Sequence, residues 1–289
     1  MGGKIGNWEL LIAKFLALFL VSAVGADELR WKFAAGEKWQ VTYASQNDST
    51  TLVNGKSTKT AVRTTVTTDW AITEMSTDGS AKITQEIARL QLEVDSPAAG
   101  NVKYDSSATA APATAAEKEI AALMKPLLCG KLTCTMSARG EISDVVPDEA
   151  LTKALGAAPQ GVTQLLEQPL LALPAEIAEG ESWLKERSLK LPFGAGTLRQ
   201  TSTLAGIETH DGVKLAKFTV VGELTVQKDP AAKLALKSHQ QTGAIWFDVE
   251  AGCFVESETT QQLSTAAPYR DGEIVVKSTT KIRTTLKKL

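Results

Sequence analysis

The sequence has few of the residues that build metal or redox centres. It contains 3 cysteines and 2 histidines in 289 residues, and Cys129, Cys134 and Cys253 form no Cys-x-x-Cys pair. Zinc sites need three or four Cys, His or carboxylate ligands at short spacings, so we expect no metal site. The three thiols leave at least one unpaired in a monomer, and their pairing stays open. Cys129 and Cys134 would lie about 16 Å apart in an extended chain, which is too far for a disulfide unless Gly130-Lys131 forms a tight turn.

The chain also lacks an excess of charge and any catalytic motif. Its 31 basic and 33 acidic residues are interleaved along the sequence, so nothing attracts nucleic acid. Nucleophile elbows, phosphate loops and dinucleotide fingerprints are absent. His210 before Asp211-Gly212 is typical of a solvated turn, and Glu256 and Glu258 are typical of a solvated strand face. We therefore predict a protein that is not an enzyme, with no catalytic residue and no cofactor.

No apolar run in the sequence is long enough to span a membrane. The longest, residues 15–24, has about half of the roughly 20 residues that a spanning helix needs. It follows Lys4 and Lys14 and ends in the small residues Val24-Gly25-Ala26. This order predicts a signal peptide over residues 1–26, a mature chain that begins at Asp27, and a secreted or periplasmic location. A retained anchor is the alternative, but after cleavage we expect no stable membrane span.

What the chain does contain is a long series of alternating segments. Residues 39–43 and 62–72 place apolar side chains at every second position, which predicts half-buried strands. Asn54-Gly55 and Asp78-Gly79 between such segments predict hairpins. The apolar positions shift by one near Ala88-Arg89, which predicts a β-bulge.

The C-terminal part repeats this pattern with short glycine turns. We expect strands near residues 183–191, 197–209, 213–227, 232–248, 253–266 and 273–287. Sequential strands joined by short turns favour an up-and-down meander. The predicted fold class is mainly β with a few helices (α+β), built from one or two long, curved antiparallel sheets.

Helical patterns occur only in the middle of the chain. Thr114 and Glu117 form a capping box, and the segment 114–125, closed by Pro126, carries the apolar stripe Ile120, Leu123, Met124 and Leu127. A second short helix is predicted after Asp148.

A four-residue phrase opens both β-rich parts of the chain. Gly36-Glu37-Lys38-Trp39 recurs as Gly180-Glu181-Ser182-Trp183, in each case at the head of a strand. The recurrence predicts two similar halves, residues 27–146 and 180–289, joined by a helical and Pro-rich bridge over residues 147–179. Whether the halves form one sheet or two domains stays open.

The repeated Gly-Glu-x-Trp phrase, the helical bridge and the Thr-rich strands resemble a family of uncharacterised secreted bacterial proteins known only as a domain of unknown function. More remotely, they resemble the periplasmic LolA/LppX half-barrels, which carry lipids or lipoproteins between a curved antiparallel sheet and helices across its concave side. The resemblance implies a half-barrel and a carrier function. No binding residue of the LolA/LppX family can be placed on this chain position by position.

Two hypotheses for function follow. In the first, the protein binds or carries an apolar, lipid-like molecule on its sheet beneath the helix at 114–125, and the binding residues are Trp39, Trp70, Ile72, Ile120, Leu123, Met124, Ile282 and Leu286. In the second, it is a structural or protein-interaction component of the cell envelope that has a filled core and no ligand.

Overall fold

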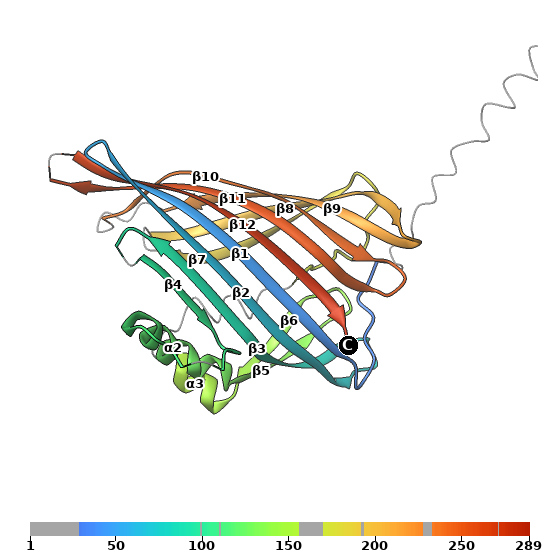
Figure 1. The fold of residues 1–289 in the computed structure, drawn as a ribbon. Coiled ribbons are helices and arrows are strands. Elements are labelled where there is room, and N and C mark those ends of the chain that lie inside the picture. The colour runs from blue at the N-terminus through green and yellow to red at the C-terminus, as the bar shows by residue number, and fades with distance from the viewer. Residues whose placement is uncertain are drawn as a thin grey trace, which may run out of the picture.

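The computed structural model describes residues 29–98, 100–109, 111–155, 170–191, 194–227, 233–270 and 272–289. The predicted signal peptide and residues 156–169 of the predicted bridge lie outside these ranges. The described chain is mostly strand with two helices, as predicted (Figure 1). Its strands are β1 (Lys38–Val53), β2 (Lys56–Met75), β3 (Ala81–Ser96), β4 (Gly100–Asp105), β5 (Lys131–Met136), β6 (Ile142–Pro147), β7 (Ser182–Leu191), β8 (Gly194–His210), β9 (Val213–Val226), β10 (Ala235–Asp248), β11 (Cys253–Tyr269) and β12 (Gly272–Lys288).

All twelve strands belong to one antiparallel sheet. Its order is β6-β5-β3-β2-β1-β12-β11-β10-β9-β8-β7, and β4 pairs with β3 outside this path. The sheet is a meander that runs from β7 to β12 and then continues from β1 to β6. The first and last strands pair along their whole length, from Trp39 opposite Lys288 to Val53 opposite Ile274. The two halves therefore share one sheet, which is open between β6 and β7.

The predicted turns and the bulge are confirmed. Asn54 and Gly55 join β1 to β2 with φ of 48° and 77°, the left-handed conformations that a type I′ turn requires. The pairing of β2 with β3 shifts between Thr67 opposite Arg89 and Thr68 opposite Ile87, so Ala88 is the extra residue. Such a bulge bends the strand and increases its twist.

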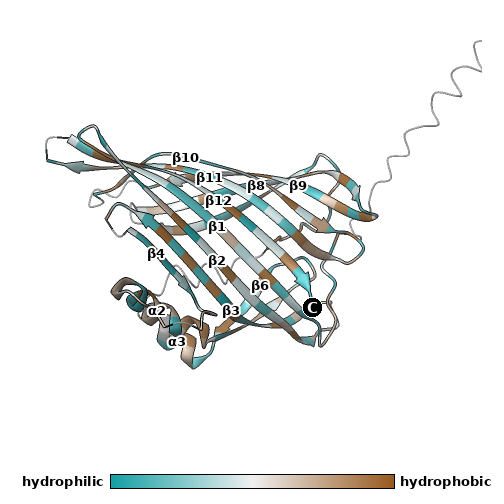
Figure 2. Cartoon of the chain, in the orientation of Figure 1, coloured by the Kyte–Doolittle hydropathy of each residue, from teal (hydrophilic) through white to brown (hydrophobic). Residues whose placement is uncertain are grey.

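Hydrophobic and hydrophilic residues alternate along the strands (Figure 2), so the two faces of the sheet carry different side chains, as the sequence predicts. We define the inner face as the one that carries Trp39 and Trp70, and the outer face as the one that carries Gln40 and Asp69. On the inner face, Ile83 of β3 and Phe218 of β9 belong to the same hydrophobic cluster, although the five strands β2, β1, β12, β11 and β10 lie between β3 and β9. The sheet must therefore curve so that its inner face is concave. The cluster, which includes Trp39, Trp70 and Phe218, fills one end of this concave face, and we call that end the closed end.

Two segments without regular structure complete the closed end. Trp31 is 2% exposed; its ring stacks on Phe33 and Trp39, and its Nε1 donates to the Leu171 carbonyl at 3.0 Å. The backbone amide of Trp31 donates to Ala138, in the turn between β5 and β6, and that of Lys32 donates to Gly252, in the turn between β10 and β11. Residues 29–37 therefore connect the part of the sheet formed by β1–β6 with the part formed by β7–β12, and residues 170–177 pack beside them.

The two helices, α2 (Ala115–Leu128) and α3 (Glu149–Leu155), pack on each other. The capping box of α2 is confirmed, since Thr114 Oγ1 accepts from the Glu117 amide and Glu117 accepts from the Thr114 amide. The helix continues through Pro126 to Leu128, three residues beyond the predicted end. Asp148 caps α3 by accepting from the Leu151 amide at 2.7 Å.

Both copies of the Gly-Glu-x-Trp phrase make the same backbone hydrogen bonds. The Gly36 amide donates to Ile72 and the Ile72 amide donates back to Glu37; Gly180, Leu204 and Glu181 repeat this exchange. The two phrases therefore anchor β1 to β2 and β7 to β8 in the same way.

Candidate functional site

Three of the residues predicted to contact a ligand lie in the closed end instead. Trp39, Trp70 and Ile72 are 0%, 4% and 1% exposed and belong to the core cluster. Their side chains pack in the core between the β1–β6 part and the β7–β12 part of the sheet and do not line an open part of the fold. Leu286 packs against the same cluster and is half-buried. The sequence pattern placed these residues on the correct face, but it did not show which end of that face is covered.

The other predicted residues lie nearer to open parts of the fold. Ile282 is half-buried on the inner face, between Ser45 of β1 and Thr259 of β11. Ile120 and Met124 are half-buried on α2, and the side chain of Leu123 lies outside the described residues. The structure therefore does not gather the predicted set into one site.

Helix α2 lies on the inner face, but over its flank. It contacts α3, β3 and β4, and its last turn places Leu127 against Leu132 and Leu151. A void of about 10 Å³ remains there, between Leu127 and the sheet residues Thr68 and Gln85. That volume holds at most one water molecule, so the end of α2 is packed and covers no ligand chamber.

Beyond the closed end, the centre of the inner face is polar. Strands β1, β12, β11 and β10 carry hydroxyl, amide and imidazole groups there. Asn47 Nδ2 donates to Thr280 Oγ1 at 2.6 Å, and His239 Nε2 lies 3.0 Å from Gln261 Nε2. The other ring nitrogen of His239, Nδ1, is buried and has no hydrogen-bond partner among the described residues. The polar floor comprises Ser45, Asn47, Ser49, His239, Gln241, Gln261, Ser278 and Thr280.

Apolar side chains flank this floor on both sides. One flank belongs to β2, β3 and β4 and the other to β7, β8 and β9. Most of these side chains are partly exposed, so solvent reaches apolar surface on the inner face beyond the core. The flanks comprise Val62, Val66, Leu90, Leu92, Val94, Val102 and Tyr104 on one side, and Leu189, Leu198 and Leu224 on the other.

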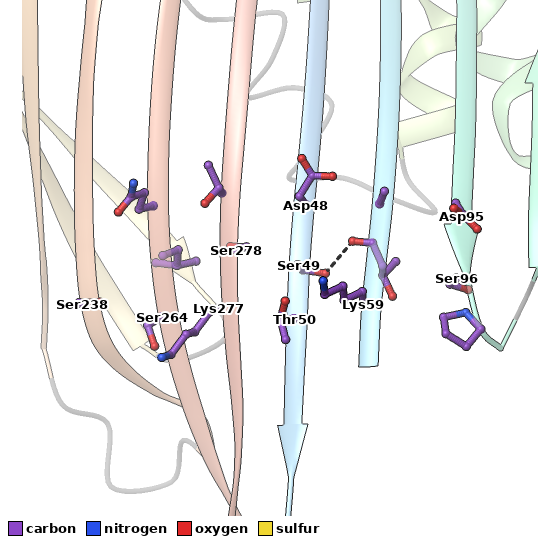
Figure 3. Close-up of a pocket in the computed structure, with 16 residues that line it drawn as sticks. Asp48, Ser49, Thr50, Lys59, Asp95, Ser96, Ser238, Ser264, Lys277 and Ser278 are labelled. Atoms are coloured by element: carbon purple, nitrogen blue, oxygen red, sulfur yellow. Dashed lines mark hydrogen bonds between the residues drawn. The ribbon is translucent and has the colours of Figure 1, made fainter. Parts of the chain in front are cut away.

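The outer face is hollowed as well, because a strongly twisted sheet is saddle-shaped. Two neighbouring troughs, of about 1010 Å³ and about 680 Å³, run along strands β2, β1, β12, β11 and β10, and the larger also reaches β3. Figure 3 shows the side chains of the larger trough, among them Asp48, Lys59 and Lys277. Sequence alternation identified this face as polar but gave no sign of its curvature.

The charges in the two troughs are arranged differently. In the smaller trough, Arg283 makes a two-pronged ion pair with Glu256, at 2.6 and 2.9 Å, and this pairing raises the pKa of the guanidinium. In the larger trough, Lys59 and Lys277 lie on either side of Thr50, and neither makes an ion pair within the described part of the chain.

The structure gathers no metal-ligand cluster among the residues it describes. No cluster of three or more His, Cys, Asp or Glu side chains occurs there. Cys134 and Cys253 are buried and Cys129 is exposed, and all three are free thiols. Burial raises the pKa of Cys134, and it raises that of Cys253 to about 11.

Comparison with known proteins shows no relative in sequence. No family model matches the chain, and no curated protein matches it, so membership of a secreted Gly-Glu-x-Trp family stays a prediction. Among solved structures, lipovitellin, described for its lipid–protein interactions, matches with 12% identity and a TM-score of 0.49 over 89% of this chain. This chain spans only 25% of that lipovitellin chain.

Two bacterial structures also match along most of their length. A putative exported protein of Bacteroides fragilis with a YmcC-like fold has 8% identity and a TM-score of 0.24, covering 86% of this chain and 96% of that one. An outer-membrane channel of Pseudomonas putida has 10% identity and a TM-score of 0.24, covering 89% and 97%. These similarities are in the arrangement of strands and carry no argument about function.

Within the described ranges, neither helix is long and apolar enough to cross a membrane.

Proposed function

We propose that this is a secreted or periplasmic binding protein, without catalytic activity, that carries an amphipathic, lipid-like molecule on the open part of its inner face. The observation that supports this proposal is the division of that face into a polar floor and two apolar flanks. A lipid presents the same two surfaces, a polar headgroup and apolar chains. Burying each methylene of a chain stabilises a complex by about 0.8 kcal/mol.

The floor offers hydrogen-bonding groups for a headgroup. His239 is half-buried, and burial lowers its pKa, so its imidazole is neutral near pH 7. The buried Nδ1 atom has no partner in the part of the chain that the structure describes, and a buried polar group without a hydrogen bond is costly. A headgroup hydroxyl or phosphate oxygen bound beside His239 would satisfy it.

The first experiment is native mass spectrometry of the mature protein, followed by extraction and identification of its bound small molecules. We expect a co-purified lipid, or saturable binding of a fluorescent fatty acid to the emptied protein. Replacement of flank residues, Leu92→Gln with Leu224→Gln, should weaken probe binding at least tenfold. Val221→Gln is the matched control, because Val221 is on β9 too but is 52% exposed on the outer face.

A second experiment tests the helix. If α2 takes part in binding, Met124→Lys should weaken probe binding more than it lowers the free energy of unfolding. Leu127→Lys is the comparison, because Leu127 packs against Leu132 of β5 and Leu151 of α3 and its replacement should mainly destabilise the fold.

The alternative, a structural or protein-interaction component of the envelope, has its own support in the filled closed end and the tightly packed end of α2. It would be preferred if the purified protein carries no lipid and the emptied protein binds no acyl probe. Equal weakening by the flank variants and by Val221→Gln would also contradict the carrier proposal.

A further inference from the structure

One row of inner-face residues crosses the sheet from β8 to β4, and each residue of the row lies directly opposite the next. At β2 the row becomes apolar, with Val62, Val94 and Val102 on successive strands. A molecule lying along the row therefore meets hydrogen-bonding groups at one end and hydrocarbon at the other. The polar part, which we call the carboxamide row, comprises Gln200, Gly222, Gln241, Gln261, Thr280 and Asn47.

Gln261 and Asn47 use only part of their hydrogen-bonding capacity within the sheet. Gln261 Nε2 lies 3.0 Å from His239 Nε2, and an amide nitrogen only donates, so the imidazole accepts this bond. Asn47 Nδ2 donates to Thr280 Oγ1. A carboxamide has two N–H donors and a carbonyl oxygen, and both side chains are half-buried. Their remaining donor and acceptor groups are therefore available to a ligand.

Gln200 and Gln241 come together across Gly222, which lies opposite both of them on β9. A Cβ added at Gly222 would meet Gln241 Oε1 at 2.7 Å, so the Gln241 side chain lies over the glycine and extends toward β8. Within the described chain neither carboxamide makes a hydrogen bond, and both are half-buried. Two further carboxamides are therefore available to the same ligand.

The sheet around these carboxamides is uncharged. On β10, β11, β12 and β1, the inner-face residues of this row and of the rows on either side of it carry no charge at pH 7, since burial lowers the pKa of His239. The first charged residue along the row is Lys185 of β7, three strands from Gln241, or about 14 Å. A charged headgroup would lose its hydration here without gaining an opposite charge, which is costly.

We infer that the headgroup bound by the carboxamide row is an uncharged, polyhydroxylated group, that is, a sugar or another polyol. A hydroxyl both donates and accepts, as a carboxamide does. Carboxamides on adjacent strands lie about 5 Å apart and so offer a series of partners to the successive hydroxyls of a sugar. The acyl chain lies over Val62, Val94 and Val102. This inference rests on the proposed function and names the class of its ligand, a glycolipid.

The experiment is calorimetric titration of the emptied mature protein with four probes, each below its critical micelle concentration. Dodecyl maltoside, dodecylphosphocholine and laurate have chains of similar length and differ in the charge of the headgroup, and maltose supplies the sugar alone. We expect dodecyl maltoside to bind about tenfold more tightly than either charged probe, because it forms additional hydrogen bonds with the carboxamides. Maltose should bind far more weakly than dodecyl maltoside, because it has no chain to bury.

The double variant Gln241→Met/Gln261→Met removes two carboxamides that lie opposite each other and keeps side chains of similar length. It should weaken the binding of dodecyl maltoside about tenfold and change that of laurate by less than about twofold. Gln240→Met/Gln262→Met is the matched control, because these two glutamines form the neighbouring pair on the same two strands but lie on the outer face. The control should bind every probe like the wild type.

The outcomes distinguish this inference from the carrier proposal on which it rests. Equal binding of the three probes that have chains, tighter binding of a charged one, or equal losses in the two double variants would overturn the inference and leave the carrier proposal standing. Binding of maltose as tight as that of dodecyl maltoside would contradict the carrier proposal and support the sugar site. Binding of none of the four probes would contradict both.

Discussion

Trp39 of β1 lies directly opposite Trp70 of β2, and neither indole Nε1 atom has a hydrogen-bond partner within the described ranges. Both rings are on the inner face at the closed end, where Trp39 also stacks on Phe33, with ring centroids 5.5 Å apart. Burial of two unpaired indole N–H groups is costly, so packing must stabilise this cluster enough to offset that cost. The pair therefore marks the part of the fold that depends most on close packing.

The first prediction compares the two tryptophans of the repeated phrase. Trp39→Ala should lower the free energy of unfolding by about 3–5 kcal/mol, the range for a large side chain truncated in a core. Trp183 is only half-buried, with an edge-on contact to Phe218, so Trp183→Ala should cost about 1–3 kcal/mol. Urea denaturation measures both. Equal losses would show that the two copies are equally buried in solution, contrary to the structure.

The second prediction concerns Gly140, in the turn between β5 and β6. Its φ is 81°, and an added Cβ would meet the Leu171 carbonyl oxygen at 2.1 Å and Trp31 Nε1 at 2.4 Å. Gly140→Ala should therefore displace the segments that complete the closed end and cost more than about 3 kcal/mol. Gly55→Ala is the matched control, since Gly55 has a similar φ of 77° but an added Cβ there would meet no described atom within 4 Å.

For Gly55→Ala we expect only the backbone cost, about 1 kcal/mol. If both glycine variants lose the same stability, the contact of Trp31 and Leu171 with the turn does not form in solution.

The sequence predicted the local features well, because each depends on neighbouring residues. Asn54-Gly55 has its own turn chemistry, and the bulge at Ala88 appears as a change in alternation. The role of Trp31 was missed, since the segment around it has no periodicity, and its hydrogen bonds to Ala138 and Leu171 join residues more than 100 positions apart. The pairing of β1 with β12 is equally distant in sequence, so alternation could not distinguish one sheet from two domains.

The candidate site was predicted only in part, for a related reason. Alternation places Trp39, Ile72 and Ile282 on one face, but it does not show that residues 29–37 and 170–177 cover one end of that face. The curvature of the sheet also cannot be inferred from the sequence of a single strand, because it depends on how neighbouring strands twist relative to one another. The troughs on the outer face and the position of α2 over a flank therefore emerge only in the folded sheet.

The third prediction tests the glutamates of the repeated phrase. Glu181 accepts from the Ala178 amide at 2.7 Å, and Glu37 accepts from the Ala34 amide at 3.2 Å. Each carboxylate closes the turn before its strand, so Glu181→Ala and Glu37→Ala should each cost about 1–2 kcal/mol. Glu176→Ala, an exposed site in the same segment as Glu181, is the control and should change stability by less than about 0.5 kcal/mol. If neither Glu181→Ala nor Glu37→Ala lowers stability, the two carboxylates do not stabilise the turns.

The fourth prediction concerns thiol reactivity. Cys129 is exposed, whereas Cys134 and Cys253 are buried with raised pKa values. At pH 8 in native buffer, a thiol reagent should label one cysteine quickly, and Cys129→Ala should abolish that fast phase. All three should react in 6 M guanidinium chloride. Fast labelling of two or more cysteines in the native protein would contradict the burial of Cys134 or Cys253.

The last prediction links Cys253 to stability at alkaline pH. Burial raises the pKa of its thiol from 9.0 to about 11, chiefly because the thiolate loses its hydration. Below pH 9 the folded and unfolded chains both keep this proton, so the Cys253 thiol does not lower the free energy of unfolding. As the pH rises from 9 towards 11, the unfolded chain releases the proton and the folded chain retains it, so the free energy of unfolding falls by up to about 2–3 kcal/mol. Cys253→Ala should remove this part of the decline between pH 8 and 10.5, whereas Cys129→Ala should leave the slope unchanged. A wild-type slope in the Cys253→Ala protein would show that other groups cause the alkaline loss.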